Sequence, residues 1–588
     1  MEKSIEENCS CGKNHHDNKA SEPGENRRDF LKKASALTMG VVASPLLASS
    51  AIGDERDFNA VAGSQVVKKR KARIITILHT ADIHSQLYTH DEFFVENGQV
   101  VFKKRGGLAV LKTMMNSLRK KNPENTISID GGDCFQGGGL AALTQGTALI
   151  PIMNNIGYDL VLPGNWEVAY GKEMMIKDLG AYNAVKVCAN MYHQTQDSFN
   201  DDLIFKPYWI KFVAGIKIGF IGYTDHAVPK RQPPAFSVGI RYTKPIEDIA
   251  KYVKILKEYE RCEMIFLVTH MGLAQQVNFA NQPAVQGVDH ILGADTHERV
   301  RQPIQGKYAT VSEPGAFGSF VSKFDIVIED GKVKDKVYQL LDVDPDRYKP
   351  DEELSELIEK ERAPYKQILE TEIGTSKIPL VRYYVLETPM DNLVTDALMW
   401  KFKPDIAISN GFRFCPPLVP DKKTGLATIN IDYLWSMVPV NGEIKWGDVP
   451  GKQLWEWLEQ ELHNVFAKNP AERFGGWVVR MKGLKLNFTM NNELGKRLNW
   501  VTIKDQPLDH NKLYRVCTCE REGDPDNVLC RLGDVQKPKL LGVDMHQTII
   551  EYLKNHSPVS PFVDGRVTAT DAPTTLLSQL EGFGYEFF

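Results

Sequence analysis

The clearest pattern along the chain is a short apolar run that ends in a loop rich in Asp, His and Asn. Such runs lie at Ile74–Leu78, Thr126–Ile129, Leu160–Leu162, Ile265–Val268 and Ile291–Leu292. Their length and the glycines that follow them predict β-strands. The loops that follow contain Asp82-Ile83-His84, Asp130-Gly131-Gly132-Asp133, Gly164-Asn165-Trp166-Glu167, Thr269-His270-Met271-Gly272 and Gly293-Ala294-Asp295-Thr296-His297. Strands that end at a common rim would bring these polar side chains together.

Helical stretches such as Gly107–Arg119 and Ile246–Tyr259 alternate with the strands and predict an α/β architecture. A charged segment follows, helical in period over Glu352–Lys360. Pro350 precedes it and acidic residues fill its first turn, where the helix dipole favours them. We therefore predict a domain over residues 73–341, a linker helix within 342–376 and a second α/β domain over 377–588.

The composition is that of an ordinary globular protein, with 42% hydrophobic and 25% charged residues among 588. This length predicts more than one domain. The net charge is only −4, and the one basic run, Lys68–Arg73, directly precedes the first predicted strand. We therefore expect no nucleic-acid partner.

The N-terminal segment has the order of an export signal. Arg27-Arg28 precedes a modestly apolar stretch, Ala34–Leu47, which ends in small residues at Ala48–Ala51. This order predicts a twin-arginine (Tat) signal peptide over residues 1–51, a linker over 52–72 and a periplasmic location. The stretch is too short for a spanning helix, so we expect no transmembrane segment. The alternative is a surface helix that happens to contain two arginines.

Nine cysteines are scattered along the chain, and Cys9 and Cys11 precede the twin arginines. The remaining seven cannot all pair with one another, and no Cys-x-x-Cys spacing indicates a zinc site. A disulfide involving Cys517, Cys519 or Cys530 is left open by the sequence.

The loop residues are those of a site for two divalent cations. Carboxylate and amide oxygens suit Mn²⁺ or Mg²⁺, and imidazoles add affinity for Mn²⁺, iron or Zn²⁺. Asp82 and His84 lie two apart, so both would face one side of an extended strand end, and Asp133 is placed to bridge two ions. The predicted ligands are Asp82, His84, Asp133, Asn165, His270, Asp295 and His297.

These loops resemble those of the calcineurin-like metallophosphoesterase superfamily, and the domain layout resembles the 5′-nucleotidase family within it. The blocks Met390–Leu398 and Ile408–Arg413 are similar to that family's C-terminal domain. The resemblance runs from Arg73 almost to the C-terminus. It implies a metal-dependent hydrolase with an N-terminal four-layer αββα metallophosphoesterase domain and a C-terminal 5′-nucleotidase-type α/β substrate domain.

Within that family, the chain resembles the SoxB thiosulfohydrolase branch. The resemblance lies in Trp166–Gly171, Gly411-Phe412-Arg413, Arg473–Trp477 and Gly565-Arg566-Val567. It implies two ions, with Mn²⁺ ahead of Zn²⁺ or iron. It also implies release of sulfate from a cysteine S-thiosulfonate carried by the SoxYZ protein. Catalytic roles would fall to Arg413, Asn165 and Trp166, and substrate binding to Arg413, Phe412, Arg473 and Trp477. The guanidinium of Arg413 would match a sulfonate's oxygens.

Two positions depart from the family pattern. Trp166 replaces a histidine that helps an alkoxide leave, which favours cleavage of an S–S bond unless His193 or His226 supplies the proton. Asp295 replaces a histidine ligand, so either a carboxylate binds the ion or the second ion is weak or lost. Two alternatives therefore stay open: a periplasmic 5′-nucleotidase or 2′,3′-cyclic phosphodiesterase, and a catalytically impaired binding protein of the Sox system.

Overall fold

The computed structural model describes residues 72–195, 198–410, 415–473 and 476–577. The signal peptide predicted over residues 1–51 lies outside these ranges, as do Phe412 and Arg413. Among the described residues, no helix combines the length and the apolarity that a membrane crossing requires.

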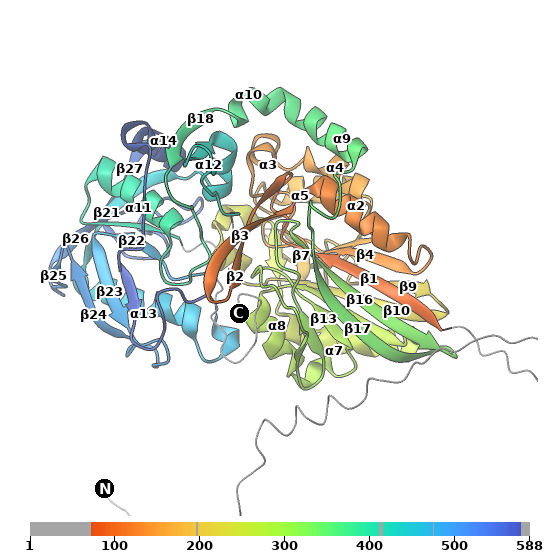
Figure 1. Ribbon diagram of the computed structural model, residues 1–588. Coiled ribbons are helices and arrows are strands. Elements are labelled where there is room, and N and C mark those ends of the chain that lie inside the picture. Colours follow the sequence, from red (N-terminus) through yellow and green to blue (C-terminus); the bar gives the residue numbers. More distant parts are fainter. Residues whose placement is uncertain (1–71, 196–197, 411–414, 474–475, 578–588) are drawn as a thin grey trace, which may run out of the picture. The chain divides into compact units, whose positions relative to one another are not determined.

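Two six-stranded sheets form the first part of the fold (Figure 1). In spatial order, the first contains β17 (Lys332–Asp342), β16 (Phe320–Glu329), β1 (Arg73–Thr80), β4 (Thr126–Asp130), β5 (Leu160–Val161) and β6 (Val185–Lys186). The second contains β14 (Ile304–Gln305), β15 (Thr310–Ser312), β13 (His290–Leu292), β12 (Met264–His270), β10 (Ile216–Thr224) and β9 (Tyr208–Val213). All five predicted strands are confirmed, as β1, β4, β5, β12 and β13.

Neighbouring side chains along β10 and β12 belong to different core clusters, which shows how the sheets and helices are layered. Phe220 and Phe266 share one core cluster with Ile77 of the first sheet, whereas their neighbours Ile221 and Leu267 belong to a different cluster. Successive side chains of a strand point to opposite faces, so the two sheets pack face to face and each carries helices on its outer face. These helices are α2 (Leu108–Arg119), α4 (Leu149–Ile156) and α5 (Lys172–Ala181) on the first sheet, and α7 (Ile249–Lys254) and α8 (Leu273–Ala280) on the second. The predicted four-layer αββα domain is confirmed.

The helix predicted over Ile246–Tyr259 is divided in the structure. A 3₁₀ turn at Pro245–Glu247 precedes α7, and Ile255–Tyr259 is a π-helical turn. The π-helical turn is defined by a hydrogen bond in which the N–H of Glu260 donates to the carbonyl of Ile255, five residues back, at 3.0 Å.

The linker helix is present as α9 (Glu352–Arg362), followed by the short α10 (Lys366–Leu369). The Asp351 side chain caps α9 by accepting from the N–H of Leu354 at 3.0 Å. Lys112 of α2 donates to Asp351 at 2.9 Å and to Asn155 of α4 at 2.6 Å, which fastens the start of α9 to the first domain.

The C-terminal part is a second α/β unit. Its five-stranded sheet has the order β22 (Arg480–Lys482), β19 (Ile406–Ser409), β26 (Leu513–Cys519), β21 (Glu443–Pro450) and β27 (Gln536–Asp544). A four-stranded sheet contains β25 (Gln506–Pro507), β24 (Leu498–Ile503), β23 (Leu484–Phe488) and β28 (Val567–Ala569). The helices are α11 (Pro389–Phe402), α12 (Ile431–Met437), α13 (Gly451–Phe466) and α14 (Met545–His556). The second α/β domain is therefore confirmed.

The described chain also contains smaller elements. Among them are the hairpin β2 (Thr89–Glu96) and β3 (Gln99–Gly106), the sheet of β7 (Met191–Thr195), β8 (Ser198–Leu203) and β11 (Ile240–Tyr242), the pair β18 (Glu372–Ser376) and β20 (Ala427–Asn430), and the helices α3 (Gly139–Thr144) and α6 (Val228–Arg231). All seven cysteines that follow residue 72 are free thiols.

Candidate metal centre

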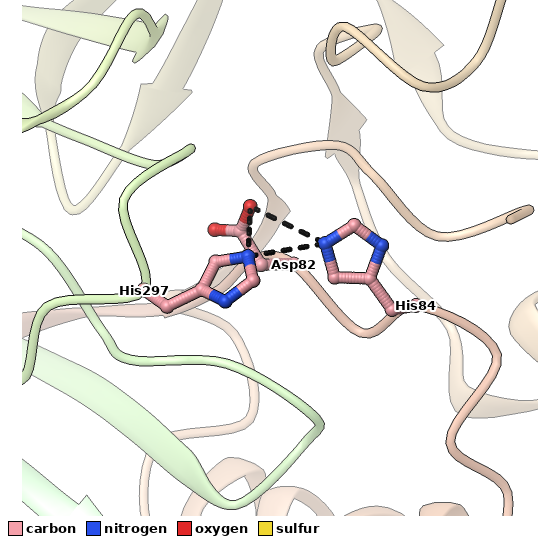
Figure 2. A group of neighbouring side chains, drawn as sticks. All are labelled: Asp82, His84 and His297. Atoms are coloured by element: carbon pink, nitrogen blue, oxygen red, sulfur yellow. Dashed lines mark hydrogen bonds and ion pairs between the residues drawn. The ribbon is translucent and has the colours of Figure 1, made fainter. Parts of the chain in front are cut away.

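One group of possible ligands consists of Asp82, His84 and His297 (Figure 2). The Nε2 atoms of the two histidines lie 3.1 Å apart, and Oδ1 of Asp82 lies 3.5 Å from Nε2 of His297 and 4.0 Å from Nε2 of His84. Ligand atoms held about 2.1 Å from one ion lie roughly 3.0–3.4 Å apart. The spacing therefore fits a single divalent cation.

A second group shares Asp82 and adds Asp133 and His270. Nε2 of His270 lies 3.0 Å from Oδ2 of Asp133 and 3.7 Å from Oδ1 of Asp82. Since both groups contain Asp82, two cations held here would be close neighbours, as in a dinuclear site.

The hydrogen bonds of the histidines favour metal binding. Nδ1 of His84 lies 3.1 Å from the carbonyl of Gln136, and Nδ1 of His270 lies 2.7 Å from the carbonyl of Gly131. A neutral imidazole that donates Nδ1–H to a carbonyl leaves Nε2 with a lone pair, which is the usual arrangement of a metal-binding histidine. Both lone pairs then point into the cluster.

The electrostatics of the cluster also favour a cation. Burial raises the pKa of Asp82 to about 7 and lowers that of His84 to about 4. Burial opposes the charged form of His270, but Asp133 and Asp82 outweigh it and raise the pKa of this imidazole well above its usual value. Positive charge is therefore favoured between the carboxylates, and a divalent ion would supply it in place of protons.

Asn165 lies beside the same cluster. Its amide group lies 3.0 Å from Nε2 of His270. With its nitrogen toward the cluster, the amide donates to Asp133, His270 and Asp295 at 2.9, 3.0 and 3.2 Å and accepts from Gln232 at 2.8 Å. Turned over, it would present its oxygen to a cation held among these atoms. The donor set thus fits two divalent cations.

The backbone of the ligand loops is strained. Asp82, His84, Asp133, Asp295 and His297 all have positive φ, between 48° and 90°. These values cost energy for residues other than glycine and persist only where the surroundings impose them. The expectation that Asp82 and His84 share one side of an extended strand end was wrong. β1 ends at Thr80, and both side chains converge through left-handed turns instead.

Asp295 lies beside the cluster but has a strong partner of its own. Its Oδ1 accepts from Nη2 of Arg231 at 2.9 Å and its Oδ2 from Nη1 at 3.1 Å. Arg231 also donates to Asp225 at 2.7 Å. Metal binding by Asp295 stays a prediction, since both of its oxygens already face a guanidinium.

Glu167 organises the centre and was missed in the sequence. Its carboxylate accepts from the backbone N–H groups of Asp133, Cys134 and Gly164 at 2.9, 2.7 and 2.7 Å, which joins the loops after β4 and β5. Burial, with Asp133 nearby, raises its pKa to about 8. The sequence feature that could have indicated this role is the position of Glu167 directly after Asn165-Trp166.

A cavity opens over the centre. It is partly open to solvent, and Asp133, Asn165, Trp166 and His297 line one side. Residues of the C-terminal part line the other: Arg382, Met437, Val438, Trp477, Arg521 and Arg531.

The structure sorts the remaining predicted residues. Trp477 lines the cavity and donates its indole N–H to the carbonyl of Arg382 at 3.0 Å, whereas Arg473 does not line it and donates Nε–H to the carbonyl of Ala467 at 2.7 Å. His193 and His226 are also absent from the lining. Phe412 and Arg413 lie outside the described residues, so their predicted roles stay predictions.

Comparison with known proteins agrees with this arrangement. Residues 75–299 match the calcineurin-like phosphoesterase family, and residues 372–520 match the 5′-nucleotidase C-terminal domain. The chain is 25% identical over 548 residues to the trifunctional nucleotide phosphoesterase protein YfkN of Bacillus subtilis (strain 168). That match covers 85% of this chain and only 35% of the relative, so this chain spans about a third of its length.

Two solved structures from Thermus thermophilus share the fold. The sulfate thiohydrolase SoxB aligns with a TM-score of 0.76 and 20% identity, over 86% of this chain and 98% of that one. A 5′-nucleotidase precursor aligns with a TM-score of 0.71 and 21% identity, over 85% and 100%. These two alignments show a shared fold, while the family matches over residues 75–299 and 372–520, together with the clustered ligands, support a metal-dependent hydrolase of the 5′-nucleotidase and calcineurin-like metallophosphoesterase superfamily.

Proposed function

We propose that the protein is a thiosulfohydrolase that releases sulfate from a cysteine S-thiosulfonate on the SoxYZ carrier. A twin-arginine signal peptide over residues 1–51 would export it, folded, to the periplasm. Water oxygen would bond to the terminal sulfonate sulfur, the S–S bond would break, and the electron pair would leave on the sulfur that stays with the carrier.

The observation that carries this proposal is Trp166. It lies at the cavity wall, its backbone N–H donates to Asp133 at 2.7 Å, and its ring packs with Ala316 and Phe317. An indole cannot supply a proton at neutral pH. An alkoxide leaving group needs that proton, and positioned acid catalysis is worth about 10²–10⁴-fold. A persulfide anion is a much weaker base and leaves without one.

The predicted ligands other than Asp295 would hold two divalent cations, with Mn²⁺ proposed first: Asp82, His84, Asp133, Asn165, His270 and His297. Such ions, when bound, acidify water and stabilise negative charge on an oxyanion. The protein's own contribution is to fix the ligands: Glu167 holds the Asp133 loop, and backbone carbonyls orient His84 and His270. Arg413 would bind the sulfonate, a role supported only by its sequence context.

The cavity walls support a carrier substrate. Met437, Val438 and Trp477 supply an apolar surface, and the guanidinium groups of Arg382 and Arg531 lie at the same wall, paired with Asp391 and Glu461. A slender peptide arm that ends in an anionic thiosulfonate combines these two properties. A nucleoside also combines an apolar base with an anionic phosphate, and a relative is named a nucleotide phosphoesterase, so a nucleotidase is the second candidate.

A direct assay separates the candidates. With added Mn²⁺, the purified protein is expected to release sulfate from thiosulfonate-charged SoxYZ and to release phosphate from AMP far more slowly, as ion chromatography and a phosphate assay would record. Efficient AMP hydrolysis without sulfate release would establish the nucleotidase instead. Fewer than two tightly bound ions per chain, with neither product formed, would indicate the impaired binding protein.

Restoring the family's histidine tests the leaving-group argument. The Trp166→His variant should hydrolyse AMP about tenfold faster than the wild type, or more, because an imidazolium can protonate the ribose oxygen. Sulfate release should not rise in parallel. Trp166→Phe, which restores no acid, is the matched control. An equal gain of phosphatase activity in both variants would show that cavity size, not proton supply, limits the reaction.

A further inference from the structure

Arg231 is a cation at the metal centre that no sequence motif indicated. It ends α6, lines the same cavity as Asp133, Asn165 and His297, and its side chain is 16% exposed. Arg231 donates two of its N–H groups to Asp295 and one to Asp225. A guanidinium carries five N–H donors in a rigid fork. The two carboxylates therefore fix its orientation without consuming its full donor capacity.

The backbone around Arg231 is fixed from the C-terminal part of the chain. The Arg521 guanidinium donates to the carbonyls of Lys230 and Gln232, on either side of Arg231. The N–H of Ala235 donates to the carbonyl of Glu522 at 3.2 Å. The side chain and main chain of Arg231 are thus both held, as a preorganised binding group requires.

The charge balance shows what Arg231 adds. Four carboxylates face the ligand cluster or Arg231: Asp82, Asp133, Asp225 and Asp295. Two divalent cations would balance these four negative charges, and the carboxylate of Glu167, which holds the Asp133 loop, adds a fifth. The guanidinium of Arg231 offsets that charge and places positive charge on the side that faces the cavity. An anionic substrate binds where positive charge faces it.

We propose that Arg231 is an oxyanion-binding residue of the loaded centre and that Asp295 serves as its anchor. The ligand is a tetrahedral oxyanion, the sulfonate or phosphoryl group of the substrate. This inference rests on the proposed hydrolysis of such a group. It gives the aspartate at the family's histidine position a function, because an imidazole there would not hold the guanidinium by two points.

Equilibrium binding to the Mn²⁺-loaded protein tests the proposal without turnover. Inorganic sulfate and phosphate are titrated separately by calorimetry, and bound manganese is counted by mass spectrometry in the same samples. Arg231→Gln should keep two ions per chain and bind the preferred anion about tenfold to a hundredfold more weakly. Arg231→Lys keeps the positive charge but not the forked guanidinium, so its anion affinity should fall less than that of Arg231→Gln. Asp295→Asn should retain both ions and weaken anion binding.

The control is Arg515→Gln. Arg515 also forms a two-point pair, with Asp448 at 3.0 and 3.4 Å, but does not line the cavity. The Arg515→Gln variant should bind sulfate and phosphate with the same affinity as the wild type. Unchanged anion affinity in Arg231→Gln at full metal content would overturn the proposal. So would loss of an ion from Asp295→Asn, since Asp295 would then be a ligand and not an anchor.

The outcome for the proposed function is read separately. Anion binding through Arg231 in a protein that releases no sulfate from charged SoxYZ would refute the thiosulfohydrolase and leave the inference standing. Preference for sulfate over phosphate agrees with a sulfonate substrate. The reverse preference points to a phosphoester bound by the same guanidinium.

Discussion

Replacing Asp82 by Asn is expected to lower the rate of the hydrolytic reaction by about a thousandfold or more. Asp82 is shared by both groups of possible ligands, so its charge faces both cation positions. Asn keeps the size of the side chain and an oxygen that can still accept the N–H of Asp295, which Asp82 does at 3.2 Å. The loss should therefore arise from metal binding and not from a collapsed loop.

Metal content is the measurement that decides this prediction. The wild type should hold two ions per chain after dialysis against Mn²⁺, and Asp82→Asn should hold one or none. Asp335→Asn, the same change on the exposed strand β17, should alter neither metal content nor rate. A full complement of metal with an unchanged rate in Asp82→Asn would exclude Asp82 as a ligand.

Replacing Glu92 by Gln is expected to destabilise the folded protein by about 3–5 kcal/mol. Glu92, on β2, is 1% exposed and contacts Nη2 of Arg299 at 2.6 Å. Its carboxylate also accepts from the hydroxyls of Ser319, at 2.9 Å, and Tyr383. A glutamine has nearly the same shape but leaves the buried guanidinium without a counter-charge, and that loss dominates the expected effect.

The destabilisation caused by Glu92→Gln should depend on pH. Burial alone would raise the pKa of Glu92, but Arg299, His90 and Tyr383 together outweigh it and lower the pKa from 4.5 to about 2. A depressed folded-state pKa contributes stability that is fully present above the unfolded value and is lost as the pH falls through the folded value. The wild type should therefore lose about 3 kcal/mol from this group between pH 4.5 and pH 2.

Urea unfolding at several pH values would measure this difference. The gap between wild type and Glu92→Gln should be largest at neutral pH and narrow toward pH 2. Glu96→Gln is the matched control, because Glu96 lies on the same strand but forms an exposed pair with Lys103. It should change stability by no more than about 0.5 kcal/mol. Similar losses in both variants would contradict the role of the buried pair.

The strands and layers of the first domain were predictable because buried strands require runs of apolar residues, which are visible in the sequence. Strands covered on both faces need continuous apolar residues, and the runs at Ile74–Leu78 and Ile265–Val268 have them. The division of Ile246–Tyr259 was not predictable, since an i→i+5 turn keeps the same apolar residues and changes only which carbonyl each N–H meets.

At the site, the sequence indicated which residue types converge but not how. Parallel strands place their carboxyl ends at one edge, so the approach of the loops carrying Asp82, Asp133 and His270 followed from the order of apolar runs. The left-handed turns at Asp82 and His84 left no signal, because neither is a glycine. The pairing of Arg231 with Asp295 spans 64 positions and belongs to no motif, so only the folded chain reveals it.

The positive φ angles of the ligand residues have a consequence for anyone who would copy this site into another protein. Grafting the same aspartates and histidines onto relaxed loops would reproduce the list of side chains but aim them in other directions. The surrounding scaffold, including the carboxylate of Glu167 that ties two loops together, would have to be transplanted with them.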